Sequence, residues 1–375
     1  MNIEQYERLI SWALKRGLFL HEGIERKQVN GVYGMYATQD IAANSIVVSF
    51  PEQALLKPAK TIDFGTGTDS IDLNYIYAAA KELDKGQGSE YSGLFDGFET
   101  LEDMRAYSTH FISMSELEVL QRMSSTAYIW VNNANQNVQK AIEAIIRADG
   151  RVDPDSVLTV LLNYRSRSFR NLGVVPVVDL FNHSDRLGLE NDLIDGKVCV
   201  RTRINYRSGE EIFISYGRKD LLQHAVQYNY FDPQGTHFIE PACRLFSTLG
   251  SARDQQIFDQ LSRRYKFQTS VSEGQTSFFL DDRNALVTEA APTPYLLQYL
   301  GDSIRAGINQ DLPGPQLYGH LLTSYAQLLD ALLVTNRREE VRREELSPRL
   351  LRFYDLLGKE VQMIEANRQW IIDHA

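Results

Sequence analysis

The sequence predicts an α+β fold in which short strands dominate the first part of the chain and helices make up the rest. Two observations support this prediction. Glycine-punctuated segments with alternating apolar residues occur before residue 232, and amphipathic helical patterns follow it. Apolar residues make up 43% of the 375 residues and charged residues 23%, so we expect a sizeable globular core. We therefore expect a mixed domain over residues 1–232 and an all-α domain over residues 245–375.

The first predicted elements are a helix and a group of strands. Residues 3–16 place apolar side chains at helical spacing, which predicts an amphipathic helix. The segment 31–51, GVYGMYATQDIAANSIVVSFP, is punctuated by glycine, and its apolar residues alternate from Ile46 to Phe50. This pattern predicts short strands that end at Pro51.

Helical patterns then interrupt the strand-rich part, and we expect a helical insertion over about residues 62–160. The predicted helices cover residues 71–83, about 113–150 and 157–169. Strand-forming residues return over 197–216, on both sides of Arg207-Ser208-Gly209. Because Ser-Gly is a common turn sequence, we predict that residues 197–216 form a β-hairpin.

The C-terminal part contains four amphipathic patterns, separated by prolines, and each predicts a helix. They cover residues 251–267, 284–308, 315–337 and 347–374. This change of character after about residue 232 is the basis for the predicted domain boundary between residues 232 and 245.

Charge and composition exclude several classes of protein. The net charge of −10 argues against a nucleic-acid partner, which would favour a basic surface. No apolar run reaches the roughly 18 residues of a membrane span, and the N-terminal residues lack the apolar stretch of a secretory signal. The two cysteines, Cys199 and Cys243, are too few for a disulfide framework or a cysteine-rich zinc site. We expect a cytoplasmic protein (or a nuclear one in a eukaryote) that holds no metal.

No single motif identifies the chemistry. The loop 62–68, IDFGTGT, is similar to the acidic glycine-rich loop of doubly wound methyltransferases, but it lacks the preceding apolar strand and the third glycine. A lone histidine such as His183 is most often structural, and Tyr216, one of 19 tyrosines, is by itself most simply a packing residue. The sequence contains neither a GxSxG motif nor a phosphate-binding Walker loop.

Three segments taken together resemble a SET domain, in the expected order and spacing. They are NGVYGMYATQDI, RSRSF followed by VVPVVDLFNHSD, and GEEIFISYGRKDLLQHAVQYNYFDP. The likeness is to the class that includes rubisco large-subunit lysine methyltransferase and the actin-histidine methyltransferase. It implies a SET fold of short β-strands with a pseudoknot-like threading of its C-terminal segment and a helical insertion. It also implies a helical C-terminal domain that helps to hold a protein substrate.

The same resemblance implies a set of site residues and a cofactor, S-adenosylmethionine, which leaves as S-adenosylhomocysteine. Tyr216 would be the catalytic tyrosine beside the transferred methyl group, and Arg167 would meet the methionine carboxylate. The residues implied to bind the cofactor are Tyr33, Gly34, Met35, Arg167, Asn182, His183 and Tyr230. The residues implied to line or support the substrate channel are Phe169, Asp179 and Tyr228. Tyr230 and Asn229 depart from the family pattern, in which phenylalanine and glycine are common at these positions.

The implied activity is methyl transfer to the side-chain nitrogen of a lysine in a partner protein. Phe169 favours lysine, because the histidine-modifying branch has a polar asparagine near this position and an apolar wall suits an aliphatic stem. Two alternatives stay open: transfer to histidine on the same fold, and a SET-like binding module without turnover. The sequence names neither the substrate protein nor the oligomeric state.

Overall fold

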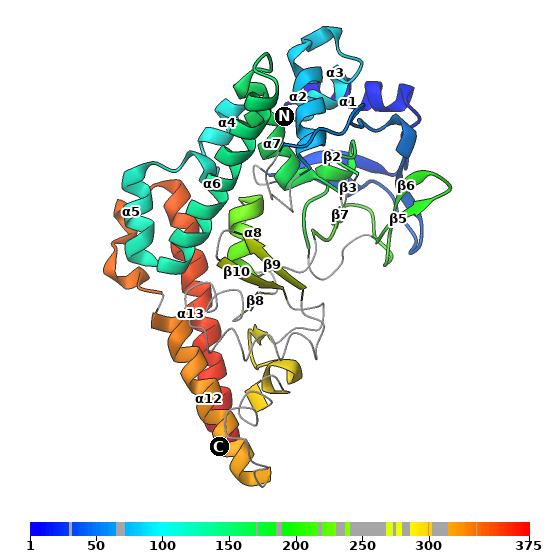
Figure 1. Cartoon of the computed structure of the whole chain (residues 1–375). Helices are drawn as coiled ribbons and strands as arrows, with labels where there is room; N and C mark the ends of the chain where they lie inside the picture. Colours follow the sequence, from blue (N-terminus) through cyan, green and yellow to red (C-terminus); the bar gives the residue numbers. More distant parts are fainter. Residues whose placement is uncertain are drawn as a thin grey trace. The chain divides into compact units, whose positions relative to one another are not determined.

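The computed structural model describes most of the chain (Figure 1). The described residues are 1–29, 32–64, 72–169, 172–184, 190–216, 220–229, 237–240, 268–272, 275–279, 286–298, 300–301, 314–334 and 336–375. The chain folds into two compact units. Unit 1 contains Met1–Tyr107 and Ala134–Arg218, and unit 2 contains Ser108–Asn133 and Lys219–Ala375. The α+β fold class is confirmed.

Two antiparallel sheets form the centre of unit 1. The four-stranded sheet has the order β1 (Phe19–Leu20), β4 (Ile46–Pro51), β6 (Lys197–Arg201) and β5 (Glu190–Ile194). The three-stranded sheet has the order β2 (Ile24–Val29), β3 (Val32–Ala37) and β7 (Glu211–Ile212). Residues of both sheets share one core, which includes Met35, Val47, Val48, Phe50 and Ile212. Because this core ties the two sheets together, it fixes the loops that leave them.

The predicted hairpin over residues 197–216 is wrong. β6 pairs with β4 and β5, whereas β7 pairs with β3 in the other sheet. The hairpin turn lies instead at Asp195 and Gly196, which have φ values of 49° and 71° and join β5 to β6. Two successive positive φ values match the twist of a two-residue hairpin.

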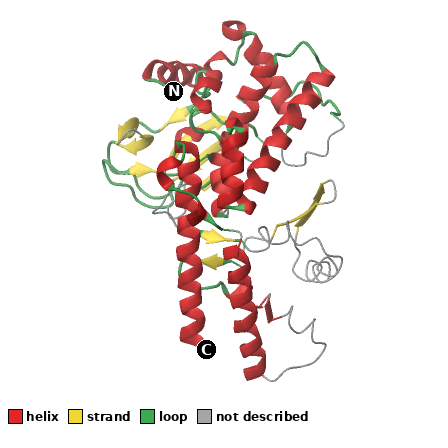
Figure 2. Cartoon of the chain, turned by 90° about the vertical axis from the view of Figure 1, so that its left-hand side faces the viewer, coloured by secondary structure: helices red, strands yellow, loops and turns green. Residues whose placement is uncertain are grey.

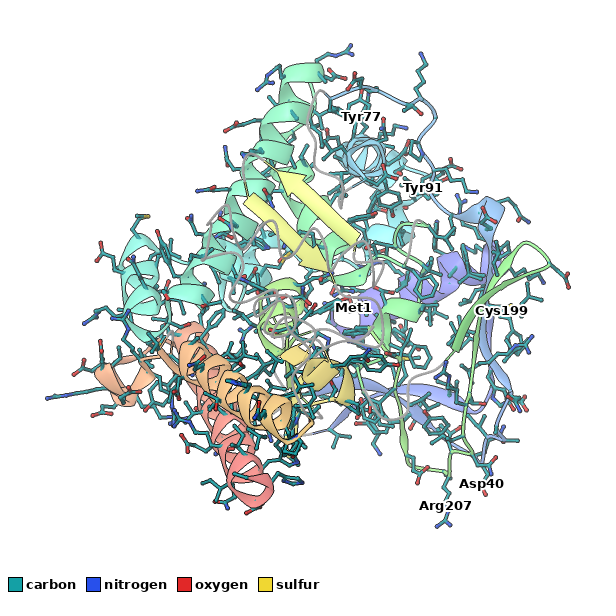
Figure 3. All side chains as sticks on the ribbon, turned by 60° about the horizontal axis from the view of Figure 1, so that its bottom comes forward. Met1, Asp40, Tyr77, Tyr91, Cys199 and Arg207 are labelled. Carbon is teal, nitrogen blue, oxygen red and sulfur yellow. The ribbon has the colours of Figure 1, made fainter. Side chains whose placement is uncertain are left out.

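The predicted turn at Arg207-Ser208-Gly209 does form, but it carries the chain from one sheet to the other. Gly209 has a φ of 89°, and the Glu210 amide donates to the Arg207 carbonyl. Figure 3 shows Asp40 and Arg207 together at this turn, where the Ser208 amide donates to Asp40 Oδ1 at 3.0 Å. Local turn chemistry was thus predicted correctly, whereas the pairing of the flanking strands was not.

Helices of unit 1 confirm most of the predicted ones. They are α1 (Ile3–Lys15), α2 (Leu73–Asp84), α3 (Ser92–Phe95), α4 (Leu101–Arg105) and α7 (Pro154–Arg167), with short 3-10 helices η1 (Glu52–Ala54), η2 (Gly86–Gly88) and η4 (Val178–Leu180). Asn2 and Gln5 form a capping box at the start of α1. Asp153 caps α7, and Pro154 occupies its first turn, where a missing amide hydrogen costs nothing.

The predicted long helix over residues 113–150 is two helices, α5 (Met114–Met123) and α6 (Ser125–Ala148). Ser124 separates them in an extended conformation, with φ −161° and ψ 116°. Its hydroxyl accepts a hydrogen bond from the Ala127 amide and so caps α6. Helix α6 begins in unit 2 and ends in unit 1.

Unit 2 is mainly helical but contains strands that we did not expect. Its helices are α5, α8 (Leu221–Tyr228), α12 (Gly314–Val334) and α13 (Pro348–His374), with 3-10 helices η3 (Thr109–Phe111), η5 (Arg338–Glu340) and η6 (Arg343–Glu345). Its strands pair as β8 (Phe238–Ile239) with β11 (Val287–Thr288), and β9 (Gln268–Ser272) with β10 (Gln275–Phe279). The predicted helix 251–267 and residue Cys243 lie outside the described residues.

Helices α12 and α13 run side by side (Figures 1 and 2) and share a buried core with β8 and β11. Tyr325, Leu329, Met363 and Ile364 are fully buried there. The predicted helices 315–337 and 347–374 are therefore confirmed. Unit 2 also takes in residues 108–133, which we had placed in the insertion of the first domain, and the units divide near residue 218 rather than at 232–245.

The described part of the chain contains no helix that is long and apolar enough to cross a membrane. Among the same residues, no three His, Cys, Asp or Glu side chains gather as metal ligands would. Cys199 is buried on β6 (Figure 3).

Candidate active site

Two distant segments of unit 1 run beside each other and hold the candidate catalytic residues. His183 and Ile214 form a parallel bridge. The Ile214 amide donates to the Asn182 carbonyl at 2.8 Å, and the Ser184 amide donates to the Ile214 carbonyl at 3.2 Å. This pairing brings Asn182, His183 and Tyr216 together. It is the contact expected if the last segment of the SET domain, which carries Tyr216, threads past the segment that carries Asn182 and His183.

Tyr216 is fixed at both its backbone and its hydroxyl. Its amide donates to His183 Nδ1 at 3.0 Å, and the two rings stack with centroids 5.0 Å apart. Its hydroxyl donates to the Phe181 carbonyl at 3.0 Å. Because the hydroxyl hydrogen is directed at Phe181, the lone pairs of the oxygen point away from that carbonyl. His183 Nδ1 also lies 3.3 Å from the Ile214 carbonyl oxygen, so this nitrogen faces both the Tyr216 amide and the Ile214 carbonyl.

Asn182 is held by a hydrogen-bonded network that the sequence did not reveal. Its side-chain amide donates to the Tyr33 carbonyl at 2.8 Å and to Glu211 Oε1 at 2.7 Å. The other oxygen of Glu211 accepts from the Tyr36 hydroxyl at 3.1 Å. Glu211 thus links Asn182 to Tyr36, and both donors of the Asn182 amide are used inside the protein.

Gly34 packs tightly against the Asn182 network from β3. A Cβ there would meet the Glu211 carboxylate and lie 3.0 Å from the Asn182 amide nitrogen. The missing side chain of Gly34 therefore lets the β3 backbone come close to these two side chains. Its neighbours differ, because Met35 is fully buried in the core and Tyr33 is 40% exposed.

Arg167 and Asp179 form a buried ion pair. The guanidinium Nη1 donates to Asp179 at 2.9 Å and to the Gly97 carbonyl at 3.0 Å, and Nη2 lies 3.6 Å from Glu99. Burial alone would lower the pKa of Arg167, but the carboxylates of Asp179 and Glu99 outweigh it and raise that pKa. Burial raises the pKa of Asp179, and the guanidinium acts against it. Both implied site residues are thus already paired with each other.

The remaining implied residues lie in different places. Phe169 follows α7, its amide donates to the Gly173 carbonyl at 2.8 Å, and its half-buried ring packs against the unit 1 core. Tyr228 ends α8 in unit 2, where burial raises its pKa to about 12 and its ring meets His224 edge-on at 5.6 Å. Tyr230 lies outside the described residues.

Unit 1 therefore brings together Gly34, Asn182, His183 and Tyr216 from segments far apart in the chain. Sequence reasoning missed Glu211 and Tyr36, although Glu211 lies within the GEEIFISYG segment. Glu211 follows another glutamate, Glu210. Nothing in this local sequence indicates that the Glu211 carboxylate accepts a hydrogen bond from the side-chain amide of Asn182. The roles implied for the individual residues stay predictions.

Comparisons with known proteins agree with this geometry. Residues 32–217 match the family model of the SET domain. The structure of Rubisco LSMT bound to sinefungin and monomethyllysine is similar with a TM-score of 0.61 and 19% identity, covering 100% of this chain and 92% of that one. The SET domain of LSMT bound to lysine and AdoHcy is similar with a TM-score of 0.60 and 18% identity, covering 99% and 91%. At these identities the likeness shows the fold. No curated protein matches the chain.

Proposed function

Because residues 32–217 form a SET domain, we propose that the protein transfers a methyl group from S-adenosylmethionine to a lysine side chain of another protein. The similar structures support the ligand and the target, since those proteins are bound to AdoMet or AdoHcy, and to lysine or methyllysine. The observation that carries the proposal in this chain is the Tyr216 hydroxyl, which is held in place by the Phe181 carbonyl.

The cofactor is assigned to the segments that meet at Gly34. Close packing of Glu211 and Asn182 against Gly34 holds the β3 backbone and Asn182 beside each other. We assign cofactor binding to the backbone of Tyr33, Gly34 and Met35, together with Asn182 and His183. When bound, S-adenosylmethionine supplies a methyl group attached to a positively charged sulfur.

Tyr216 suits the catalytic position because it offers an oxygen without a negative charge. Its hydroxyl hydrogen is directed at Phe181, so the lone pairs are left to orient a polarised methyl group through weak C–H···O contacts. A carboxylate in this place would pair with the lysine ammonium and keep it charged. Alignment of the reacting atoms can lower the barrier by several kcal/mol, roughly 7–11 in favourable cases.

The lysine must lose a proton before it can attack. Its free pKa is about 10.4, and burial beside a positive charge disfavours the ammonium form. Asp179 is paired with Arg167, so we do not assign it to proton transfer. The proton leaves to water.

The half-buried, apolar ring of Phe169 favours lysine over histidine. An aliphatic lysine stem packs well against such a wall, whereas an imidazole ring would need a polar partner to orient its nitrogen. Transfer to histidine is the second candidate, and a SET-like binding module without turnover is the third. The presence of Tyr216, His183 and Asn182 in one cluster argues for turnover.

The test is methyl transfer from labelled S-adenosylmethionine to proteins of a lysate, with labelled positions mapped by mass spectrometry. We expect label on a lysine, and a large loss of label when Tyr216→Phe replaces the wild type. Label on a histidine would keep the fold and cofactor and overturn the argument from Phe169. A chain that binds the cofactor but labels no protein in any matched lysate would favour the binding module.

A further inference from the structure

A valine shortly before the candidate site has a strained backbone conformation. Val177 has φ 72° and ψ −34°, and it lies in a turn directly after Pro176. A turn that needs a positive φ at its third residue normally has glycine or asparagine there. Valine is poorly suited to this conformation, because its side chain branches at Cβ and crowds the backbone. The other described residues with positive φ are glycines, asparagines and an aspartate, which tolerate it.

Core packing offsets the strain at Val177. Its side chain is fully buried in the core of unit 1, together with the neighbouring side chains of Val175, Val178 and Phe181. Glycine would suit the backbone at this position but would leave its place in the core empty. A residue that breaks a local rule and is held by the surrounding structure is typical of a functional site. What the strain does therefore depends on the contacts of the residues that follow.

The residues after Val177 lead directly to the catalytic tyrosine. The short 3-10 helix η4 follows, and its Leu180 amide donates to the Val177 carbonyl at 3.1 Å. The next carbonyl along the chain, that of Phe181, accepts from the Tyr216 hydroxyl at 3.0 Å. Because this tight turn leaves little slack, the backbone of Val177 decides where the Phe181 carbonyl points. A valine relaxed to its usual negative φ would send the chain in another direction.

We propose that Val177 is a positioning residue, whose left-handed backbone aims the Phe181 carbonyl at the Tyr216 hydroxyl. This inference rests on the proposed function, in which the hydrogen-bonded hydroxyl orients the methyl group. Burial of the valine side chain keeps the turn in one conformation, so the carbonyl is in place before a substrate binds. Such preorganisation favours turnover, because the backbone need not reorder during the reaction. Val177 acts through Phe181 and takes no part in the chemistry itself.

The first test compares alanine and glycine at Val177 and Val178 by chemical denaturation of the full-length protein. At Val178, which has no positive φ, glycine should be less stable than alanine, because it loses more backbone freedom on folding. At Val177 we expect the reverse order, with a higher denaturation midpoint for Val177→Gly than for Val177→Ala. The reason is that glycine adopts a positive φ without strain. A lower midpoint for Val177→Gly would show that the turn is unstrained and would overturn the proposal.

The second test measures label transfer from S-adenosylmethionine in a lysate in which the wild type labels a protein. Val177→Gly should transfer label roughly 10- to 100-fold more slowly, because the Phe181 carbonyl is no longer held in one direction. Affinity for S-adenosylhomocysteine should change little, since Glu211 still holds the Asn182 side chain. Val178→Ala is the matched control, because it shortens another buried valine of the same segment. Its label transfer per folded protein should stay near that of the wild type.

The third test asks whether the loss of turnover passes through Tyr216. In a Tyr216→Phe background no hydroxyl is left to hold, so adding Val177→Gly should slow label transfer no further. A further loss of the same size in the double variant, or wild-type transfer by Val177→Gly alone, would overturn the assignment. A wild type that labels no protein would overturn the proposed function, whereas the order of the denaturation midpoints would still decide whether Val177 is strained.

Discussion

The described residues of each unit include a buried ion pair between an arginine and a carboxylate, and the two pairs differ in what surrounds them. In unit 2, Arg349 lies 2.8 Å from Glu116, with 9% and 17% of their side chains exposed. In unit 1, Arg167 lies 2.9 Å from Asp179, with 14% and 4% exposed. Distance and burial alone would make them equivalent.

Glu116 belongs to a cluster of hydrogen-bond donors that connects two helices of unit 2. Its carboxylate accepts hydrogen bonds from the Ser113 amide, the Ser347 hydroxyl and Arg349, which joins the start of α5 to the start of α13. Burial raises the pKa of Glu116, but these donors outweigh it and lower that pKa overall. The ionised carboxylate is thus better stabilised in the folded unit than in water.

The pair in unit 1 has a different electrostatic balance. Two carboxylates, Asp179 and Glu99, share the one guanidinium of Arg167, and burial raises the pKa of Asp179 in spite of that guanidinium. The comparison teaches that the donors around Glu116 stabilise its ionised form and so the fold, whereas a buried acid whose pKa stays raised beside an arginine is a feature typical of a functional site.

The largest expected effect is on the stability of unit 2. Glu116→Gln leaves the buried Arg349 without a counter-charge, and we expect it to destabilise the protein by about 3 kcal/mol. Binding of S-adenosylhomocysteine to the folded variant should be unchanged. Chemical denaturation and calorimetric binding measure the two effects, with Glu118→Gln on the exposed face of α5 as control. If Glu116→Gln binds S-adenosylhomocysteine more weakly but is as stable as wild type, Glu116 serves ligand binding and not stability.

Acid should weaken the same cluster in the wild type. Because the pKa of Glu116 is lowered from its ordinary value of 4.5, its ionised form contributes stability above that pH. That contribution is lost as the pH falls through the lower pKa of the folded state. Denaturation midpoints between pH 6 and 3 should therefore fall more steeply for wild type than for Glu116→Gln. Parallel curves would show that Glu116 does not carry the acid sensitivity.

The next effect is on turnover in unit 1. Tyr216→Phe removes the hydroxyl that the Phe181 carbonyl holds, and we expect turnover to fall roughly 100-fold, the cost of misplacing a reacting group. Cofactor affinity should change little. Tyr77→Phe on α2 (Tyr77 is labelled in Figure 3) is the control, because it removes a tyrosine hydroxyl bonded to Asp149, a residue outside the candidate site. Equal turnover in the two variants would exclude Tyr216 from the reaction.

Local sequence patterns predicted the helices and strands of this chain better than they predicted which strands pair with each other. Helical periodicity located α1, α2, α7, α12 and α13, and a resemblance of motifs located Tyr216, His183 and Asn182. The pairing of β7 with β3, by contrast, depends on residues 175 positions apart, and no local signal encodes it. Ser124 was predicted to be helical because serine can lie inside a helix or cap its start. In the structure its hydroxyl accepts a hydrogen bond from the Ala127 amide, and a new helix begins after it.

The same limit explains why Glu211 was missed. It is a charged residue on a strand, where charge normally indicates a solvent-facing position. Its role depends on a contact with a residue far away in the sequence, the side-chain amide of Asn182. Only the three-dimensional structure separates such residues from the ordinary charged surface.

The smallest expected effect tests whether Glu211 acts through Asn182. Asn182→Ala and Glu211→Ala should each raise the Kd of S-adenosylhomocysteine roughly 10-fold, the usual lower bound for a group that orients a ligating residue. Since the carboxylate acts by holding the Asn182 amide at 2.7 Å, the double variant should bind no more weakly than Asn182→Ala alone. Glu211→Gln should keep most of the affinity, because its amide oxygen can still accept from Asn182 while Tyr36 reverses its hydrogen bond. Additive losses in the double variant would mean that Glu211 does not act through Asn182 and supports only the fold of the sheet. Glu211 would then serve stability, as Glu116 does in unit 2.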